Sequence, residues 1–348
     1  MTDETLTAAI HARMRAALPG ALSGEPVTGP AFATELDRFH ALVRDYPSRM
    51  GKTVRGRLVV LSARAHGAVT DEAAIIVAAA LELFQAWVLV HDDIEDDSET
   101  RRGAPALHRL VGMPVALNVG DALHVHMWRL LHELLGHPGV DAKAIIDEFA
   151  TMIDRTAEGQ HLDLTYVDTG NVDIGADAYL HMVTLKTAYY TVVSPLRLGA
   201  LLAGVEPDPA LTPTGIDLGV AFQIRDDVLN LRPGSGAAGA YGKEFAGDLY
   251  EGKRTLITAH LLAAARPDEA AEVRKLLAGP RAARGEAAVT RLLALVAAHG
   301  SLDHAQRVAE ERAASGLARL QSVLARLPGG AAADRLLSIL DAVAVRVS

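Results

Sequence analysis

The sequence contains no cysteine, few aromatic residues and fewer basic than acidic side chains. Without cysteine the chain can form neither disulfides nor zinc–thiolate sites, and it has no thiol nucleophile. The net charge of −9 argues against a nucleic-acid-binding protein, which normally presents a basic face. Aromatic residues make up only 4% of the chain, whereas Ala and Leu, which form helices readily, are abundant. The composition therefore predicts an all-α protein.

Uninterrupted apolar runs are also missing. A membrane-spanning helix needs about 20 predominantly apolar residues, and the most apolar stretch, residues 73–90, is broken by Glu82 and Gln85. The first 18 residues carry early acidic side chains and no continuous apolar core, so they do not resemble a signal peptide. We therefore expect residues 73–90 to form a buried core helix, and we expect a cytoplasmic protein without an integral membrane segment.

No alternating strand pattern, fixed-period repeat or clear interdomain linker is present in the 348 residues. The pattern is one helix after another, separated by breaks that contain Gly or Pro. We expect a single domain over residues 1–348, in which residues 1–29 form an N-terminal helix and a Gly/Pro-rich segment. Residues 30–348 would then form a helical bundle around a central cavity, with the last hundred residues forming amphipathic helices. Residues 232–253 are the longest stretch without a helical pattern, and long loops of this kind are usually functional.

An unusual acidic cluster closes the helix predicted from Thr70 to about Ser98. Asp92 and Asp96 are one turn apart and project from the same face, with Asp93 beside them. Acidic groups in a last turn oppose the helix dipole at a cost of about 0.3–1 kcal/mol each, and like charges four residues apart add to it. A solvated helix end is the ordinary interpretation, but this density of acids favours a bound cation.

A second cluster repeats this spacing in a helix predicted to begin at residues 212–213 and to end before Pro233. Asp226, Asp227 and Asn230 stand at i, i+1 and i+4, again near the C-terminal end of an apolar helix. Two such clusters can face each other across a bundle core. Carboxylate oxygens without cysteine suit a hard cation such as Mg²⁺, which is typically completed by substrate phosphates.

Basic residues beside glycines or helix ends accompany the two clusters. Any one of them could be solvated surface charge. Together with the carboxylates they predict a site for more than one phosphorylated group, because Arg grips phosphate oxygens bidentately and Lys acts as a point charge. These residues are Lys52, Arg55, Arg101, Arg102, Lys186, Lys243, Lys253 and Arg254.

Taken together, these motifs resemble the trans-prenyl diphosphate synthases. HDDIEDDSETRRG (91–103) is similar to that family's DDxxD motif followed by RRG, and FQIRDDVLN (222–230) is similar to its FQxxDDxxD motif. GKTVR (51–55), GQ (159–160), KT (186–187) and GKEFAGDLYEGKRT (242–255) match further family motifs in the family's order. The matches extend from residue 51 to 255, about three-fifths of the chain.

The resemblance implies an all-α isoprenoid-synthase fold, usually homodimeric, and condensation of isopentenyl diphosphate with an allylic diphosphate. It implies three Mg²⁺ ions with substrate bound, with Mn²⁺ as the alternative ion. The implied metal ligands are Asp92, Asp93 (less directly), Asp96, Asp226 and Asp227.

The resemblance also assigns the basic residues. It implies that the allylic diphosphate is bound by Arg101, Lys186, Lys243 and Lys253. It implies that isopentenyl diphosphate is bound by Lys52, Arg55, Gln85 and Arg102. The implied catalytic residues are Lys186, Thr187, Gln223, Asp92 and Asp226.

Two positions depart from the family pattern. Gln85 stands where the family often has His, and it can donate a hydrogen bond to phosphate but carries no charge. Asn230 replaces the third acid of the second motif, the least direct metal ligand, so we expect activity to be retained.

Product length is expected to depend on Trp87 and Val88, one turn before Asp92 on the same face. A bulky Trp87 beside a smaller Val88 leaves more depth than two aromatic residues would. The pattern therefore favours a twenty-carbon product, geranylgeranyl diphosphate, with fifteen-carbon farnesyl diphosphate as the alternative.

Two other classes of function fit the sequence less well. A class I terpene cyclase shares the fold and the first motif, but the sequence after Asp226 lacks the cyclase second motif and a cyclase has no use for a second set of diphosphate-binding cations. A non-catalytic partner subunit would normally have lost one acidic motif, and both are present here.

Overall fold

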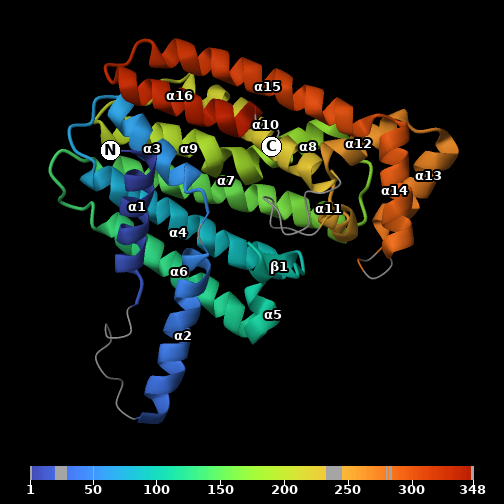
Figure 1. Cartoon of the computed structure of the whole chain (residues 1–348), viewed down its shortest axis with the longest axis horizontal. Helices are drawn as coiled ribbons and strands as arrows, with labels where there is room; N and C mark the ends of the chain where they lie inside the picture. Colours follow the sequence, from blue (N-terminus) through green and yellow to red (C-terminus); the bar gives the residue numbers. More distant parts are fainter. Residues whose placement is uncertain are drawn as a thin grey trace. The chain divides into compact units, whose positions relative to one another are not determined.

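The computed structural model describes residues 2–19, 30–49, 51–232, 245–279, 281 and 284–345. Nearly all regular structure in these residues is helical, as the composition predicts (Figure 1). The chain divides into two compact units. Unit 1 comprises Met1–Glu148, Pro195–Pro207 and Arg326–Leu336, and unit 2 comprises Phe149–Ser194, Asp208–Ala325 and Leu337–Ser348. The expectation of a single domain stays a prediction.

Unit 1 is built from the N-terminal helices and one small hairpin. Its elements are α1 (Asp3–Ala17), α2 (Pro30–Ser48), α3 (Val54–Ala65), α4 (Glu72–Glu95), β1 (Thr100–Arg101), β2 (Ala104–Pro105), α5 (Leu107–Val111) and α6 (Met113–His132). It also contains the start of α7 (Ala142–Asp168), most of α9 (Ser194–Leu202) and the start of α16 (Gly330–Val345). The hairpin was not expected from the sequence, because its strands are only two residues long.

Helix α4 is the core of unit 1 and packs against α3 and α6 (Figure 1). It begins at Glu72 after the N-cap Asp71 rather than after Thr70, and it ends at Glu95 rather than near Ser98. By length and composition α4 could cross a membrane, but most of its apolar window is buried inside the structure. Of the helices in the described part of the chain, it alone meets that test.

Unit 2 contains most of α7 and the following elements. These are α8 (Gly175–Val183), the π-helix η1 (Thr184–Val193), α10 (Leu211–Asn230), α11 (Gly247–Glu251), α12 (Leu256–Ala264), α13 (Pro267–Ala278), α14 (Glu286–Ala298), α15 (Ser301–Leu324) and the end of α16. The C-terminal hundred residues thus form helices, as predicted. Helix α10 begins at Leu211 after the N-cap Ala210, slightly before the predicted start at residues 212–213, and ends at Asn230, before Pro233 as predicted.

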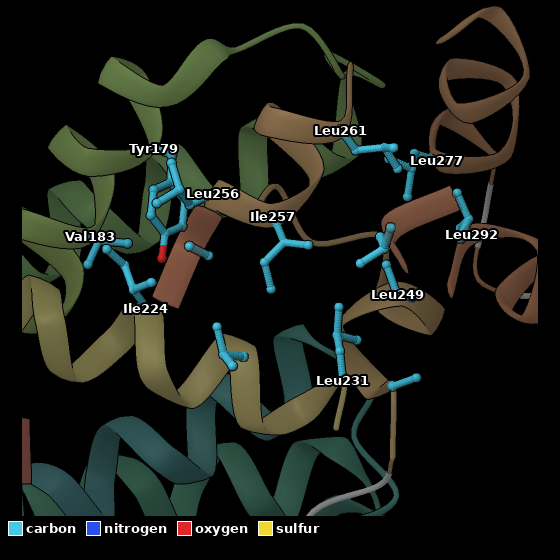
Figure 2. Close-up of a cluster of buried hydrophobic side chains, with 14 of the residues drawn as sticks. Tyr179, Val183, Ile224, Leu231, Leu249, Leu256, Ile257, Leu261, Leu277 and Leu292 are labelled. Carbon is cyan, nitrogen blue, oxygen red and sulfur yellow. The ribbon is translucent and has the colours of Figure 1, made fainter. Parts of the chain in front are cut away.

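The apolar core of unit 2 joins α8, α10, α11, α12, α13 and α14. Figure 2 shows Tyr179 and Val183 near Ile224, and Leu256 and Ile257 from α12 reaching toward the other helices. Tyr179, Ile224 and Ile257 are each at most 1% exposed. Burying such side chains contributes about 1.5–3 kcal/mol each, so this cluster fixes the helices that carry the second acidic motif.

The π-helix η1 follows α8 directly and carries Lys186 and Thr187. π-helical turns are rare and occur frequently at functional sites. Gly159 of α7 lies against this stretch so closely that a Cβ there would be 2.1 Å from the backbone nitrogen of Lys186. The glycine of the GQ motif therefore permits the close approach of α7 to η1.

We predict that Gly159→Ala destabilises unit 2, because backbone cannot yield as a flexible side chain can. Overpacking of this kind costs about 1–3 kcal/mol, measurable as the free energy of unfolding in urea. The control is Gly330→Ala at the start of α16, where no described atom lies within 4 Å of the added Cβ. Equal stability of the two variants would contradict the close-packing argument.

Candidate active site

The second aspartate of the first acidic motif is an anchor inside unit 1. Asp93 is fully buried. Its Oδ1 accepts hydrogen bonds from Nε of Arg101 at 2.9 Å and from Nη2 of the same guanidinium, and its Oδ2 accepts one from the Tyr46 hydroxyl. Buried charges are stable only when they are paired and hydrogen-bonded. Both oxygens of Asp93 are engaged by side chains, so its part in metal binding stays a prediction.

The partners of Asp93 are held in the required charge states. Burial and the neighbouring Asp93 carboxylate both raise the pKa of Tyr46, so its hydroxyl remains a donor. Burial lowers the pKa of Arg101, but the charge of Asp93 and the hydrogen bonds to it raise that pKa above its ordinary value overall. Nη2 of Arg101 also lies 3.3 Å from Oδ2 of Asp92, so one guanidinium joins both carboxylates.

The RRG sequence forms the turn of the β1–β2 hairpin. Arg101 pairs with Ala104 across the hairpin, and the two residues between them, Arg102 and Gly103, have φ of 54° and 76°. Positive φ at both central residues is the signature of a type I′ turn, for which glycine is favoured. The turn sends Arg101 inward to Asp93, while Nη1 of Arg102 donates to the carbonyl of Arg49.

The other two carboxylates of the motif are less enclosed. Asp92 is half-buried in the last turn of α4, and Asp96 is the C-cap of that helix, its backbone nitrogen donating to the Asp92 carbonyl at 2.8 Å. In the described part of the chain no group of three or more His, Asp or Glu side chains is close enough to hold a metal ion alone. The oxygen donors fit Mg²⁺ that is completed by phosphate oxygens.

Unit 1 contains an open pocket whose space, the adjoining solvent included, is about 400 Å³. Its walls include Gln85 and Arg102, two of the four residues predicted to bind isopentenyl diphosphate, together with Gly51 and Arg101. Lys52 is exposed and Arg55 is half-buried at the start of α3, and neither is among its walls. The pocket therefore brings together part of the predicted set.

Glu82 is a wall residue that the sequence did not predict. Its Oε1 accepts a hydrogen bond from the backbone nitrogen of Gly56 at 3.0 Å. Burial raises the pKa of Glu82, while the charges of Arg55 and Arg102 oppose that rise. Its position three residues before Gln85 on α4 was the available signal, but in the sequence it only interrupts an apolar run.

The predicted chain-length residues lie on the part of α4 that faces α6. The Trp87 ring stacks on the His124 ring with centroids 4.0 Å apart and meets the Phe84 ring edge-on at 5.6 Å. Nε1 of Trp128 donates to Nε2 of His124 at 2.7 Å, which fixes the orientation of the imidazole. Val88 is half-buried.

In unit 2 the second acidic motif is anchored in a similar way. Asp227 is buried, its Oδ2 accepts from the Tyr179 hydroxyl at 2.6 Å and its Oδ1 accepts from Nε2 of Gln223 at 2.8 Å. Oε1 of Gln223 in turn accepts from the Thr187 hydroxyl at 3.0 Å. The structure thus brings Thr187, Gln223 and Asp227 together and adds Tyr179, whose pKa is raised by burial and by Asp227.

The remaining members of this motif have different surroundings. Asp226 is half-buried on α10. Asn230 is buried, and its side-chain oxygen accepts from the backbone nitrogen of Asp248 at 3.1 Å while its carbonyl accepts from Ala246 at 2.9 Å. The amide that departs from the family pattern therefore fixes the start of α11.

A carboxylate outside the predicted site residues organises the lysines of unit 2. Oδ2 of Asp163 accepts from Nζ of Lys186 at 2.6 Å and from Nζ of Lys253 at 2.9 Å. Burial raises the pKa of Asp163, but the two ammonium groups lower it below its usual range overall. Asp163 follows Gly159 by one helical turn and therefore lies on the same face of α7 as the glycine of the GQ motif. Lys243, the remaining predicted allylic ligand, lies outside the described residues.

Comparisons with known proteins agree with the motifs. Residues 37–296 match the family model described as polyprenyl synthetase. A geranylfarnesyl diphosphate synthase of Aeropyrum pernix is 33% identical over 307 residues, covering 85% of this chain and 91% of that protein. A geranylgeranyl diphosphate synthase of Sulfolobus acidocaldarius is 33% identical over 286 residues, covering 81% and 84%.

A solved structure confirms the expected isoprenoid-synthase fold. It is a geranylgeranyl pyrophosphate synthase from Corynebacterium glutamicum, complexed with isoprenyl diphosphate and magnesium. It superposes with a TM-score of 0.84 at 25% identity, with 100% of each chain covered.

We predict that Asp163→Asn lowers the free energy of unfolding by about 3–5 kcal/mol at pH 7, because it leaves two lysines without their shared carboxylate. A carboxyl group whose pKa is depressed on folding stabilises the protein above its unfolded pKa, about 3.9, and loses that contribution as the pH falls through and below this value. The difference between wild type and variant should therefore shrink below about pH 4, as measured by denaturation in urea.

The control is Asp173→Asn, which removes a surface ion pair with Arg274. Exposed pairs contribute about 0–1 kcal/mol. If both variants lost the same stability, the lysine pair would not depend on Asp163.

Proposed function

The chain belongs to the polyprenyl synthetase family and is a prenyltransferase that makes trans-prenyl diphosphates, and from this premise we propose that it is a geranylgeranyl diphosphate synthase. It elongates allylic diphosphates by head-to-tail condensation with isopentenyl diphosphate and stops at twenty carbons.

The observation that best supports the condensation of two diphosphate substrates is the presence of two cationic sites, one in each unit. Unit 2 holds Lys186 and Lys253 on one oxygen of Asp163. Unit 1 holds Arg102 and Gln85 in the walls of one pocket. A reaction that joins two diphosphate substrates needs two such sites, whereas a cyclase binds only one diphosphate.

The proposed roles follow this division except for Arg101, which belongs to unit 1 and is assigned to the allylic diphosphate. The allylic diphosphate is bound by Arg101, Lys186, Lys243 and Lys253. Isopentenyl diphosphate is bound by Lys52, Arg55, Gln85 and Arg102. Mg²⁺, when bound, supplies positive charge to the diphosphate oxygens and would be held by Asp92, Asp96 and Asp226, with Asp93 and Asp227 as further predicted ligands.

The reaction begins when the carbon–oxygen bond of the allylic substrate breaks and its electron pair leaves with the diphosphate. Lys186 and Lys253 stabilise the negative charge that develops on this leaving group, and they are already fixed by Asp163. The double bond of isopentenyl diphosphate then attacks the allylic cation, forming the new carbon–carbon bond. A proton is lost from the adduct to the released diphosphate, which restores a double bond. Thr187 and Gln223, linked to Asp227, support the reacting centre.

The twenty-carbon limit rests on Trp87. This side chain is held between α4 and α6 by the stack on His124, so it is a rigid obstacle one turn before Asp92. The alternatives are the fifteen-carbon farnesyl product and the twenty-five-carbon product named for the Aeropyrum pernix relative.

We propose that the protein is a cytoplasmic homodimer. Helix α6 supports the dimer because Met113, Leu117 and Val125 recur every four or eight residues on one face and are 59%, 45% and 51% exposed. Exposed apolar stripes of this kind mark protein–protein interfaces.

The test of the proposed function is incubation of purified protein with Mg²⁺, isopentenyl diphosphate and, separately, dimethylallyl, geranyl and farnesyl diphosphates. Chromatography of the dephosphorylated products should give a twenty-carbon all-trans alcohol, and a chelator should abolish it. Products that stop at fifteen or twenty-five carbons would contradict the twenty-carbon proposal and support the corresponding alternative. No elongation with any starter would point to a cyclase or a silent subunit.

We predict that Trp87→Ala lengthens the product, since removing the indole opens space below the first acidic motif. Trp87→Phe is the matched control, because it retains an aromatic ring against His124 and should keep most of the wild-type distribution. The carbon number of the products measures both. An unchanged product length in Trp87→Ala would show that another residue limits the chain.

A further inference from the structure

Helix α1 is firmly docked within unit 1. Leu6, Ile10 and Met14 are at most 3% exposed and pack toward the rest of the unit. Near its start Asp3 pairs with Arg57 of α3 and with Arg335. The helix therefore presents a fixed face to α3 and α4, which it contacts.

His11 lies on that face and reaches the pocket that contains Gln85 and Arg102. It is only 4% exposed. Its Nε2 is 2.6 Å from the hydroxyl oxygen of Thr53 in the GKTVR sequence. One of its two ring nitrogens is thus committed to the loop between α2 and α3.

The other nitrogen, Nδ1, is buried and has no hydrogen-bond partner among the residues that the structure describes. Buried polar atoms are rarely left unpaired, because an unmade hydrogen bond costs stability. Because His11 lines the pocket, a ligand oxygen that arrives there can satisfy this nitrogen.

The charges around His11 indicate what that ligand is. Arg101 and Arg102 line the same pocket, and Arg49 is another of its walls. Burial, Arg15 and Arg102 lower the pKa of His11, so the ring is neutral in the free protein and carries one N–H. Arg101 is paired with Asp93 and Arg49 with Asp45. Arg102, which faces the Glu82 carboxylate across the same pocket, and an N–H donor on His11 suit a phosphate oxygen.

We propose that His11 of the N-terminal helix binds the diphosphate of isopentenyl diphosphate through Nδ1, with the Thr53 hydroxyl orienting the ring. The proposal rests on the proposed function, which supplies the substrate. When the Thr53 hydroxyl donates to Nε2 at 2.6 Å rather than to the Gly51 carbonyl at 3.4 Å, the ring proton resides on Nδ1 and is directed to the ligand. Helix α1 is then part of the substrate site rather than a covering segment.

Two substitutions at the same position separate ligand binding from support of the loop. His11→Asn places its amide near the position of Nδ1 and gives up the contact with Thr53. His11→Gln places its amide near the position of Nε2 and keeps that contact while removing the Nδ1 donor. His181→Gln on α8, at an exposed position, is the control for the substitution itself.

We expect His11→Gln to raise the KM for isopentenyl diphosphate about tenfold, the size expected for a lost hydrogen bond to a charged group. The KM for the allylic substrate and kcat should stay near wild type, and His11→Asn should retain most of the affinity. Calorimetric titration with isopentenyl diphosphate alone should show the same order. Thermal unfolding checks that the variants are folded.

An unchanged KM in His11→Gln, or equal increases in both KM values in both variants, would overturn the proposal, because the ring would then only support the loop. Failure of the proposed function would give a different experimental result. Wild-type protein would then elongate no starter, whereas calorimetric binding of isopentenyl diphosphate to wild type and variants would still test the pocket.

Discussion

Each acidic motif depends on one buried aspartate whose two oxygens must both be hydrogen-bonded. In unit 1 this is Asp93, held by Tyr46 and Arg101, and in unit 2 it is Asp227, held by Tyr179 and Gln223. A carboxylate left unpaired in such a position would be strongly destabilising. The hairpin that carries Arg101 and the core packing of Tyr179 are therefore required for the motifs to form. The preceding aspartate of each pair, Asp92 or Asp226, is half-buried.

Much of the fold was predictable because composition and the Gly- or Pro-containing breaks between helices act locally. The helical class, the two long apolar helices and their acidic ends follow from helix propensity and from spacing along one turn. Thr70 was a reasonable N-cap, but Asp71 takes that place without a side-chain cap. The β1–β2 hairpin escaped prediction because two-residue strands have no periodicity, although Arg102-Gly103 carries the chemistry of its turn.

The candidate site was predictable where its charged residues stand close together in sequence motifs. It was less predictable where tertiary packing brings together residues that are far apart in the sequence. Gln85 and Arg102, predicted to bind the same substrate, share a pocket, whereas Glu82 and His11 in the same pocket were not predicted. The roles of Glu82 and His11 depend on the packing of α1 against α4 in the folded chain. Tyr46 and Asp163 were missed for the same reason, since a lone tyrosine or aspartate on a helix is usually a surface or core residue until its partner is known.

The lysine pair on Asp163 has a consequence for how a substrate is received. A free lysine loses up to about 2 kcal/mol of side-chain entropy when it is immobilised. Lys186 and Lys253 are already immobilised by one carboxylate oxygen. In the proposed site, an arriving diphosphate meets two ammonium groups whose ordering was completed when the chain folded. Binding becomes an exchange of hydrogen-bond partners rather than the capture of two moving side chains.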